Sequence, residues 1–319
     1  MASRNVIVFG PTGAVGSAAA RTAHSYGAKV ALAMRDISKS IPGLDKADEE
    51  LGRYERVQAD LTQPETVLAA VTETGATHAF IYITFGGSAD HMRSTIEALK
   101  TGGVQSVVLL SSSSVQDDIR SVSPSDFIAF AHARVEVSLE DVFGRNGYVA
   151  VRPGFFANNT LWWRSQIGED GEVKTAFPGL VFDYISPEDI GAVCGTILAD
   201  VSRTRIENVV PLVGPEQLPI IDAVGIVAKA IGKEAKVTLV SQEENVQVMV
   251  EKSGLPKPMA QTLIRQFAEL EASIKSPDFF QSPAFKASQD AKANTERYLG
   301  HPPTRLFEWV EQNKTKFGP

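Results

Sequence analysis

Residues 6–16 read Val-Ile-Val-Phe-Gly-Pro-Thr-Gly-Ala-Val-Gly, and this stretch decides the fold. The four apolar residues predict a short buried strand, and a helical pattern follows over residues 15–26. Glycines therefore stand where a strand ends and a helix begins. Gly10 permits a tight turn, Gly13 a close approach of the backbone to a ligand, and Gly16 the packing of the helix against the strand. The stretch predicts the first βα unit of a doubly wound α/β sheet.

The chain after this unit continues to alternate strand with helix. Apolar or β-branched runs predict further strands at residues 29–34, 56–59, 77–84, 106–111 and 147–152. Beyond Pro153 the alternation loosens, and a polar helical stretch runs over residues 258–274. We therefore expect a Rossmann-like doubly wound parallel sheet of at least six strands in residues 1–155. A smaller substrate-binding region, with segments that return to the sheet, is expected in residues 156–319.

The composition is that of an ordinary globular protein, with 319 residues of which 43% are hydrophobic and 22% charged. The formal net charge of −7 argues against a general nucleic-acid or membrane-surface role, because phosphate-rich partners need basic surfaces. No apolar stretch approaches the about 20 residues of a membrane span. The single cysteine, Cys194, cannot form an internal disulfide, and no Cys/His cluster has zinc-ligand spacing. We expect a cytoplasmic protein without a bound metal.

The glycine-rich turn predicts a dinucleotide site, because the N-terminus of the following helix offers unpaired N–H donors to a pyrophosphate. Arg35 lies 35 − 16 = 19 positions beyond Gly16, at the tip of the second strand. A carboxylate there binds the ribose hydroxyls of NAD, whereas an arginine pairs with the 2′-phosphate of NADP. Arg35 therefore favours NADP(H), and Lys39 adds a second positive charge. Asp36 leaves NAD open as the minor alternative.

Two further turns follow predicted strands. Asp60 ends the third strand, and its carboxylate either accepts a hydrogen bond from the adenine amino group or caps the next helix; the sequence leaves both open. Thr84-Phe85-Gly86-Gly87 follows the fourth strand. Its glycines allow the backbone to pass under the ribose and pyrophosphate.

These features resemble the NmrA-like branch of the atypical short-chain dehydrogenase/reductases. The resemblance covers residues 4–240 and rests on Gly10-Pro11-Thr12-Gly13-Ala14-Val15-Gly16, Arg35, Asp60-Leu61, Tyr148 to Gly154 with Phe156 and Asn158, and Ser186-Pro187-Glu188-Asp189-Ile190. It implies a Rossmann domain, an NADP(H) preference and a small C-terminal substrate region. Members of this branch reduce small molecules, isomerise or cyclise them, or sense the redox state of the cofactor.

The resemblance also implies roles for single residues. Those at the pyrophosphate are Thr12, Ala14 and Val15; those facing the nicotinamide ribose are Ser111 and Ser112; those lining the nicotinamide amide are Pro153, Gly154 and Phe155, with Asn158 nearby. Leu61 belongs to the same cofactor set through its motif with Asp60.

The proton donor is the point at which the chain departs from the family pattern. Many reductases of this superfamily use Tyr-x-x-x-Lys, but no tyrosine lies between Tyr82 and Tyr148 and no lysine between Lys100 and Lys174. Counting back from the strand at 148–152 places Phe130 at the tyrosine position and Arg134 at the lysine position. Arginine can bind the ribose but stays charged.

Two side chains remain as candidate acids. His132 has an unperturbed pKa near neutrality, although a lone histidine on a helix is more often a packed or surface residue. Two positions from Phe130, it is expected on a different helix face. Tyr184 is the alternative proton donor.

Aromatic residues crowd the segment after the sixth strand: Phe155, Phe156, Trp162, Trp163, Phe177 and Phe182. They form either an apolar wall for a flat substrate or a packed core beneath a loop, and the sequence leaves both open. Phe156, Asn158, Trp162 and Trp163 are the predicted substrate contacts.

The sequence thus predicts an NADPH-dependent reductase of a hydrophobic small molecule, with secondary metabolism as an expectation from the family. Without a side-chain acid, an imine or a conjugated alkene is a better acceptor than a ketone, because it requires less proton donation at the reacting centre. The alternatives are a catalytically silent NADP(H) sensor that binds a protein partner, and a cofactor-bound isomerase or cyclase. The oligomeric state stays open.

Overall fold

The computed structural model describes residues 4–50, 54–86, 89–115, 118–199, 207–276 and 283–318. Over these residues the chain forms a seven-stranded sheet in the order β3-β2-β1-β4-β5-β6-β9, with every pair parallel. The strands are β1 (Asn5–Phe9), β2 (Lys29–Met34), β3 (Tyr54–Gln58), β4 (His78–Tyr82), β5 (Ser106–Leu110), β6 (Tyr148–Pro153) and β9 (Val209–Leu212). The predicted Rossmann-like fold is therefore confirmed, and the six predicted strands lie within two residues of their observed bounds.

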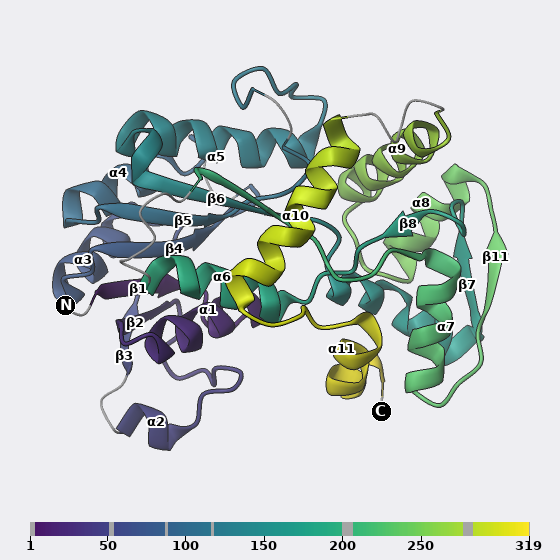
Figure 1. The fold of residues 1–319 in the computed structure, drawn as a ribbon, viewed down its shortest axis with the longest axis horizontal. Coiled ribbons are helices and arrows are strands. Elements are labelled where there is room, and N and C mark those ends of the chain that lie inside the picture. The colour runs from purple at the N-terminus through teal and green to yellow at the C-terminus, as the bar shows by residue number, and fades with distance from the viewer. Residues whose placement is uncertain are drawn as a thin grey trace.

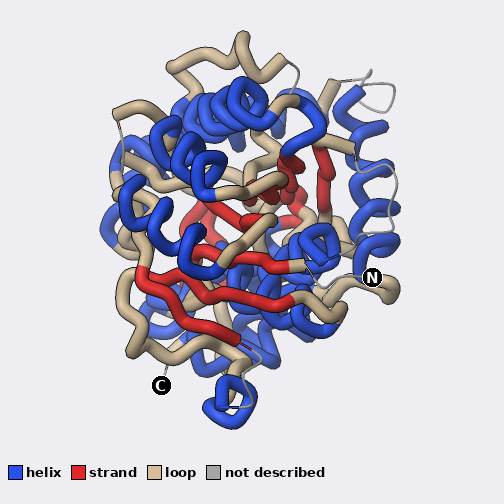
Figure 2. Tube along the Cα trace, turned by 90° about the vertical axis from the view of Figure 1, so that its left-hand side faces the viewer, coloured by secondary structure: helices blue, strands red, loops and turns tan. Residues whose placement is uncertain are grey.

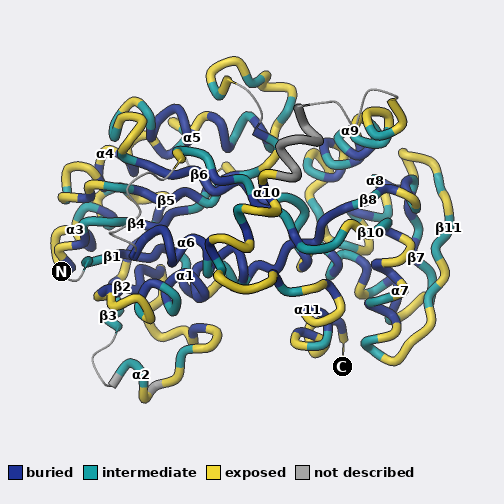
Figure 3. Tube along the Cα trace, in the orientation of Figure 1, coloured by how far each residue is buried: buried dark blue, intermediate teal, exposed yellow. Residues whose placement is uncertain are grey.

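Helices cover both faces of this sheet (Figures 1 and 2). One face carries α1 (Ala14–Ser25), α6 (Pro187–Ala199) and α10 (Pro283–Leu299), and the other α3 (Pro64–Thr74), α4 (Arg93–Gly102) and α5 (Phe127–Phe143). The short helix α2 (Lys46–Glu50) precedes β3 at the edge of the sheet. Because both faces are covered, the central strands β1, β4, β5 and β6 are largely apolar and buried, whereas the edge strand β3 carries polar, half-buried residues (Figure 3).

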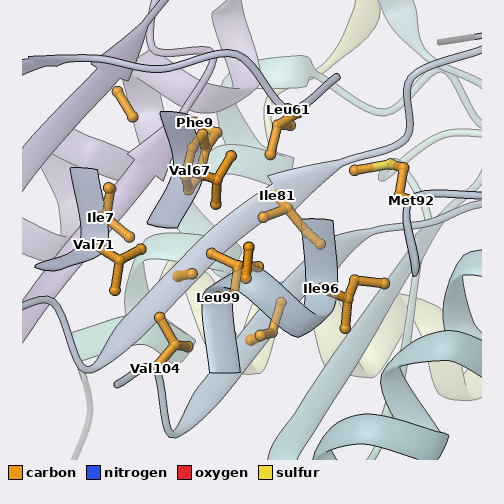
Figure 4. Close-up of a cluster of buried hydrophobic side chains, with 14 of the residues drawn as sticks. Ile7, Phe9, Leu61, Val67, Val71, Ile81, Met92, Ile96, Leu99 and Val104 are labelled. Atoms are coloured by element: carbon orange, nitrogen blue, oxygen red, sulfur yellow. The ribbon is translucent and has the colours of Figure 1, made fainter. Parts of the chain in front are cut away.

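Successive side chains of β1 enter different cores, as the two-residue period of a strand requires. Ile7 and Phe9 pack with Val67 and Val71 of α3 and with Leu99 of α4 (Figure 4). The residues between and before them, Val6 and Val8, point to the opposite core with α1 and α6. The sheet is thereby fixed between two apolar layers.

The backbones of α1 and α6 approach each other closely. A Cβ atom on Gly191 of α6 would lie 2.3 Å from the carbonyl oxygen of Val15, and one on Gly195 would lie 2.5 Å from that of Ala19. Only glycine fits at either position, so α6 holds the helix that begins at the glycine-rich turn.

A third apolar core lies in the C-terminal part. It contains two small sheets, β7 (Glu172–Thr175) with β11 (Lys236–Leu239) and β8 (Val181–Phe182) with β10 (Leu218–Pro219). Around them lie α7 (Ile220–Ala230), α8 (Gln242–Glu251), α9 (Lys257–Ile274) and α11 (Leu306–Asn313), with short helical turns at η2 (Ala157–Trp163), η3 (Gln166–Asp170) and η5 (Lys314–Phe317). Another short turn, η1 (Arg145–Gly147), joins α5 to β6 of the main sheet. Although β9, α6 and α10 follow residue 155, they belong to the layers of the main sheet. The assignment of residues 156–319 to substrate binding stays a prediction.

Candidate functional site

The carboxyl ends of β1 and β4 lie side by side at the point where the strand order reverses. In open α/β sheets this switch point is where ligands bind. Gly10 leaves β1 with a φ of +67°, and its N–H donates to the carbonyl oxygen of Ala33 at 3.1 Å. A Cβ atom on Gly16 would lie 2.3 Å from the Gly10 carbonyl oxygen. Position 16, in the first turn of α1, therefore accommodates only glycine while the helix packs this closely against the end of β1.

The N-terminus of α1 is open to an anion. Gly13 is its N-cap and no side chain caps the helix. Thr12 and Gly13 are exposed, and Ala14 and Val15 are half-buried. The first N–H groups of a helix have no partner within it, so this turn presents donors and partial positive charge at the switch point. The geometry suits the pyrophosphate role expected of Thr12, Gly13, Ala14 and Val15.

In the loop after β2, Asp36 is hydrogen-bonded within the loop, whereas Arg35 is not. Asp36 Oδ1 accepts hydrogen bonds from the Ser38 hydroxyl at 2.6 Å and the Ser38 N–H at 3.0 Å, and these bonds lower the pKa of Asp36. Arg35 and Lys39 are exposed, and within the described part of the chain neither forms an ion pair. The carboxylate is thus committed to its own turn, whereas both cations are available to a phosphate.

Arg56 of β3 shapes the same loop without adding net charge to it. Its guanidinium donates to the carbonyl oxygens of Ile37 and Lys39, the latter at 2.8 Å. It also pairs with Glu49, with 2.7 Å between Nη2 and Oε1. The pair is neutral as a unit, so the positive charge of the loop comes from Arg35 and Lys39.

Asp60 and Leu61 close the next turn. Asp60 Oδ1 accepts hydrogen bonds from the N–H and the hydroxyl of Thr62, at 2.9 and 2.8 Å. The N-cap of α3 is Gln63, so the carboxylate orders the turn before the helix and does not cap the helix itself. Leu61 is buried in the core beneath. An adenine contact from these two residues stays a prediction.

Thr84 and Phe85 follow β4 at the switch point. The Thr84 hydroxyl oxygen is buried and has no hydrogen-bond partner among the described residues. Phe85 is 45% exposed. Gly86, with a φ of +68°, allows the chain to turn here, and Gly87 of the predicted turn lies outside the described residues.

The hydroxyls after β5 have partners inside the protein. Ser111 is buried and donates to Glu136 Oε1 at 2.5 Å, while the Ser112 oxygen lies 2.9 Å from that of Ser114. Because these hydroxyls are engaged, the expected contact of Ser111 and Ser112 with the nicotinamide ribose stays a prediction without support from the geometry.

A buried ion pair that the sequence reasoning missed lies behind Ser111. Glu136 of α5 is fully buried and accepts two bonds from Arg152 of β6, from Nε at 3.0 Å and from Nη2 at 2.6 Å. Arg152 Nη1 also donates to the carbonyl oxygen of Val115 at 2.8 Å. The pair thereby fastens the loop after β5 to β6. The sequence pattern could have predicted this pair, because both charged residues occupy positions that the apolar pattern of the strand or helix assigns to the buried face.

The structure does not favour the predicted acids. Burial, with a smaller effect from the Arg152 guanidinium, lowers the pKa of His132 to about 3, so the ring is neutral at pH 7. Desolvation thus removes from His132 the near-neutral pKa that a free imidazole has and that made it a candidate acid, and its catalytic role stays a prediction. Burial and the Asp183 carboxylate raise the pKa of Tyr184, whose hydroxyl has no hydrogen-bond partner among the described residues. Arg134 is exposed on the solvent side of α5.

The segment after β6 is held by Asp183. Its two carboxylate oxygens accept the N–H of Phe155 at 3.0 Å and of Gly214 at 2.9 Å. A Cβ atom on Gly154 would lie 2.5 Å from Asp183 Oδ1, which explains glycine there. Pro153 ends β6 and is buried. This clamp, also missed by the sequence reasoning, fixes the backbone expected to line the nicotinamide.

The aromatic segment is mostly packed core. The Phe155 ring stacks on that of Phe182 with centroids 4.1 Å apart and meets the Trp162 ring edge-on at 5.8 Å. Trp163 is buried, and the cavity that Phe155, Trp162 and Trp163 help to line measures about 30 Å³. That volume holds about one water molecule.

The other two predicted substrate contacts lie apart from this cavity. Phe156 packs against the core of the main sheet and forms an isolated bridge with Ile185. Asn158 is exposed. A substrate wall made of Phe156, Asn158, Trp162 and Trp163 stays a prediction.

No group of three or more His, Cys, Asp or Glu residues in the described ranges is arranged to hold a metal ion. No described helix is long and apolar enough to cross a membrane.

Comparison with known proteins matches the chain to one family and to several relatives. The NmrA-like family matches residues 2–293. The nitrogen metabolite regulation-like protein of Gibberella fujikuroi is 33% identical over 98% of this chain and 97% of its own length. The NAD(P)H azoreductase of Xenophilus azovorans is 24% identical over 98% of this chain and 99% of its own length.

Among solved structures, the NADPH-dependent quinone oxidoreductase of Escherichia coli in complex with NADPH superimposes with a TM-score of 0.69. The two chains are 18% identical, and the match covers 97% of this chain and 99% of the other. This likeness shows a shared fold.

Proposed function

The chain belongs to the NmrA-like family, and we propose that it is an NADPH-dependent oxidoreductase that reduces a hydrophobic, conjugated small molecule. The observation that carries the proposal is the loop after β2, where Asp36 is bonded to Ser38 and Arg35 faces solvent without an ion-pair partner among the described residues. An arginine at this position matches the extra phosphate of NADPH in charge and geometry.

The residues at the switch point fit the cofactor. A Cβ atom on Gly10 would lie 2.5 Å from the Tyr82 ring, and one on Gly16 would collide with the Gly10 carbonyl oxygen, so both positions are kept free of side chains. The uncapped N-terminus of α1 would bind the pyrophosphate, and Arg35 with Lys39 the 2′-phosphate. The quinone oxidoreductase of the same fold was solved with NADPH, which supports this assignment. When bound, NADPH supplies a hydride.

The acceptor class follows from the side chains near the carboxyl ends of β4 to β6. His132 is neutral, the Tyr184 hydroxyl is buried with a raised pKa, and Ser111 already donates to Glu136. None of the three is a ready proton donor at pH 7. We therefore propose an electron-poor conjugated acceptor, such as an imine, a quinone or a conjugated alkene, whose proton comes from water. The azo and quinone substrates in the names of the two reductases above support this class.

The test is the oxidation of NADPH, followed by its absorbance, with a quinone, a cyclic iminium ion and a simple ketone as acceptors. We expect turnover with the first two and little with the ketone. Efficient ketone reduction would contradict the acceptor class, and failure to bind NADPH would contradict the proposed function as a whole.

A second candidate is a redox sensor that binds NADP(H) and a protein partner. Two observations favour it: the 33% identical relative is described as regulation-like, and the aromatic cavity holds only about 30 Å³. A sensor would bind NADP⁺ and NADPH with different affinities, retain a partner in one redox state only, and oxidise no acceptor of the panel.

A further inference from the structure

Two exposed phenylalanine rings lie in contact at the carboxyl edge of the sheet. Phe85, after β4, is 45% exposed, and Phe127, the first residue of α5, is 42% exposed. Their centroids are 5.7 Å apart with 26° between the planes, a stacked arrangement. Rings left this open forgo the free energy of burial, so an exposed stacked pair next to a ligand site is a candidate contact surface.

Of the residues that the structure describes, one unpartnered polar side chain contacts this pair, and another belongs to the residue before Phe85. The His132 ring meets the Phe85 ring edge-on, with centroids 5.9 Å apart. His132 is 8% exposed, and its Nδ1 has no hydrogen-bond partner among the described residues. The hydroxyl oxygen of Thr84, the residue before Phe85, is equally buried and unpartnered within the same set. A buried polar atom without a partner is destabilising, so the Nδ1 atom of His132 beside the Phe85 ring and the Thr84 hydroxyl are candidate partners for a polar ligand atom.

These residues lie close to the expected cofactor site. Thr84 and Phe85 follow β4, which lies beside β1 and its glycine-rich turn. A molecule resting on Phe85 is therefore at the switch point where the cofactor is expected to bind. The neutral imidazole of His132 has one donor and one acceptor nitrogen, and so pairs with either a carbonyl oxygen or an N–H group.

We propose that Phe85 and Phe127 form an aromatic platform on which the acceptor stacks, with its polar atom turned toward Thr84 and His132. The inference rests on the proposed reductase function and names its substrate class more closely: a flat, conjugated ring that carries a carbonyl or imine group. The acceptor ring would cover the exposed faces of the two phenylalanine rings, and its heteroatom would hydrogen-bond to the Thr84 hydroxyl or the His132 imidazole.

Calorimetric binding of naphthoquinone to the full chain saturated with NADP⁺ tests the platform, because the oxidised cofactor prevents turnover. Phe127→Ala is expected to raise the Kd about threefold to tenfold, the size of an aromatic stacking contribution. Phe127→Tyr keeps the ring and should bind like the wild type. Phe307→Ala is the matched control, because Phe307 is 48% exposed but lies on α11, and it should leave the Kd unchanged.

The polar end is tested with a second ligand. His132→Leu should weaken binding of naphthoquinone but not of naphthalene, which offers no heteroatom, so a general loss of structure would be distinguished from a lost hydrogen bond. The platform is overturned if the wild type does not bind naphthoquinone, or if Phe127→Ala and Phe307→Ala have the same effect. Binding of NADP⁺ is measured separately, and its failure would count against the reductase function while naphthoquinone binding to the free protein still tests the platform.

Discussion

Glu136 and Arg152 form a buried ion pair that joins α5 to β6, with 2.6 Å between Arg152 Nη2 and Glu136 Oε2. Arg152→Met leaves the fully buried Glu136 carboxylate with Ser111 as its one remaining side-chain donor among the described residues. Removal of one partner of a buried pair typically costs 3–5 kcal/mol, so we expect the free energy of unfolding in urea to fall by about 3 kcal/mol. The double variant Glu136→Leu/Arg152→Met should recover part of the loss. A double variant less stable than Arg152→Met alone would show that the pair matters for another reason.

Arg35→Ala is expected to raise the Kd for NADPH about tenfold or more while leaving that for NADH unchanged. The reason is the loss of charge-assisted hydrogen bonds to the 2′-phosphate, worth about 1.5–3 kcal/mol. Arg145→Ala is the control. The Arg145 side chain is 82% exposed and lies just before the start of β6, away from the carboxyl ends of the strands where the cofactor is expected. Titration of each variant with both cofactors measures the effect. Equal losses for NADPH and NADH would refute the assigned preference.

Two glycine substitutions in the same turn should have different effects. A Cβ atom on Gly16 would lie 2.3 Å from the Gly10 carbonyl oxygen, so Gly16→Ala should lower both thermal stability and NADPH binding. A Cβ atom on Gly13 would lie 3.6 Å from that oxygen, an ordinary contact. Gly13→Ala should therefore fold normally and lose affinity for NADPH, because the new methyl group faces the expected pyrophosphate. Scanning calorimetry and cofactor titration separate the two outcomes.

His132 makes stability depend on pH. Its pKa is about 3 in the folded protein, against an ordinary value of 6.5. Between pH 3 and pH 6.5 the imidazole is protonated in the unfolded chain but neutral in the folded protein, which favours unfolding. The free energy of unfolding therefore has its full value above about pH 6.5 and decreases as the pH falls toward 3. At pH 5 the loss amounts to about 2 kcal/mol relative to pH 7.

His132→Leu should therefore flatten the dependence of the unfolding free energy on pH between 7 and 5. His78, whose pKa burial lowers to about 4, provides a second site of the same kind, and its replacement by leucine should flatten the curve further. A slope in His132→Leu identical to that of the wild type would mean that the histidine is not desolvated in solution.

Local patterns predicted the parts of the fold that depend on neighbours in the sequence. The glycine-rich turn and Arg35 could be predicted because they lie within one continuous strand-helix-strand unit, β1-α1-β2, where spacing along the sequence fixes their positions. The short strand β9, Val209–Leu212, contains a proline and gives only a weak pattern, so it was missed. The Glu136–Arg152 pair and the Phe85–Phe127 contact depend on how separate elements meet. The pKa of His132 could not be read from its residue type, because burial sets it.

The close fit of α6 against α1 has a consequence for synthesis. The C-terminal end of α1, Ser25, leaves the ribosome 199 − 25 = 174 residues before α6 is complete at Ala199, a delay of roughly 10 to 30 s at ordinary elongation rates. During that interval the alanine-rich face of α1 has no glycine-lined partner to cover it. The glycine-rich turn before α1 is among the first segments to be made, yet α6 packs against α1 only when most of the sheet has already been synthesised. A fragment that ends near residue 155 would lack that packing permanently.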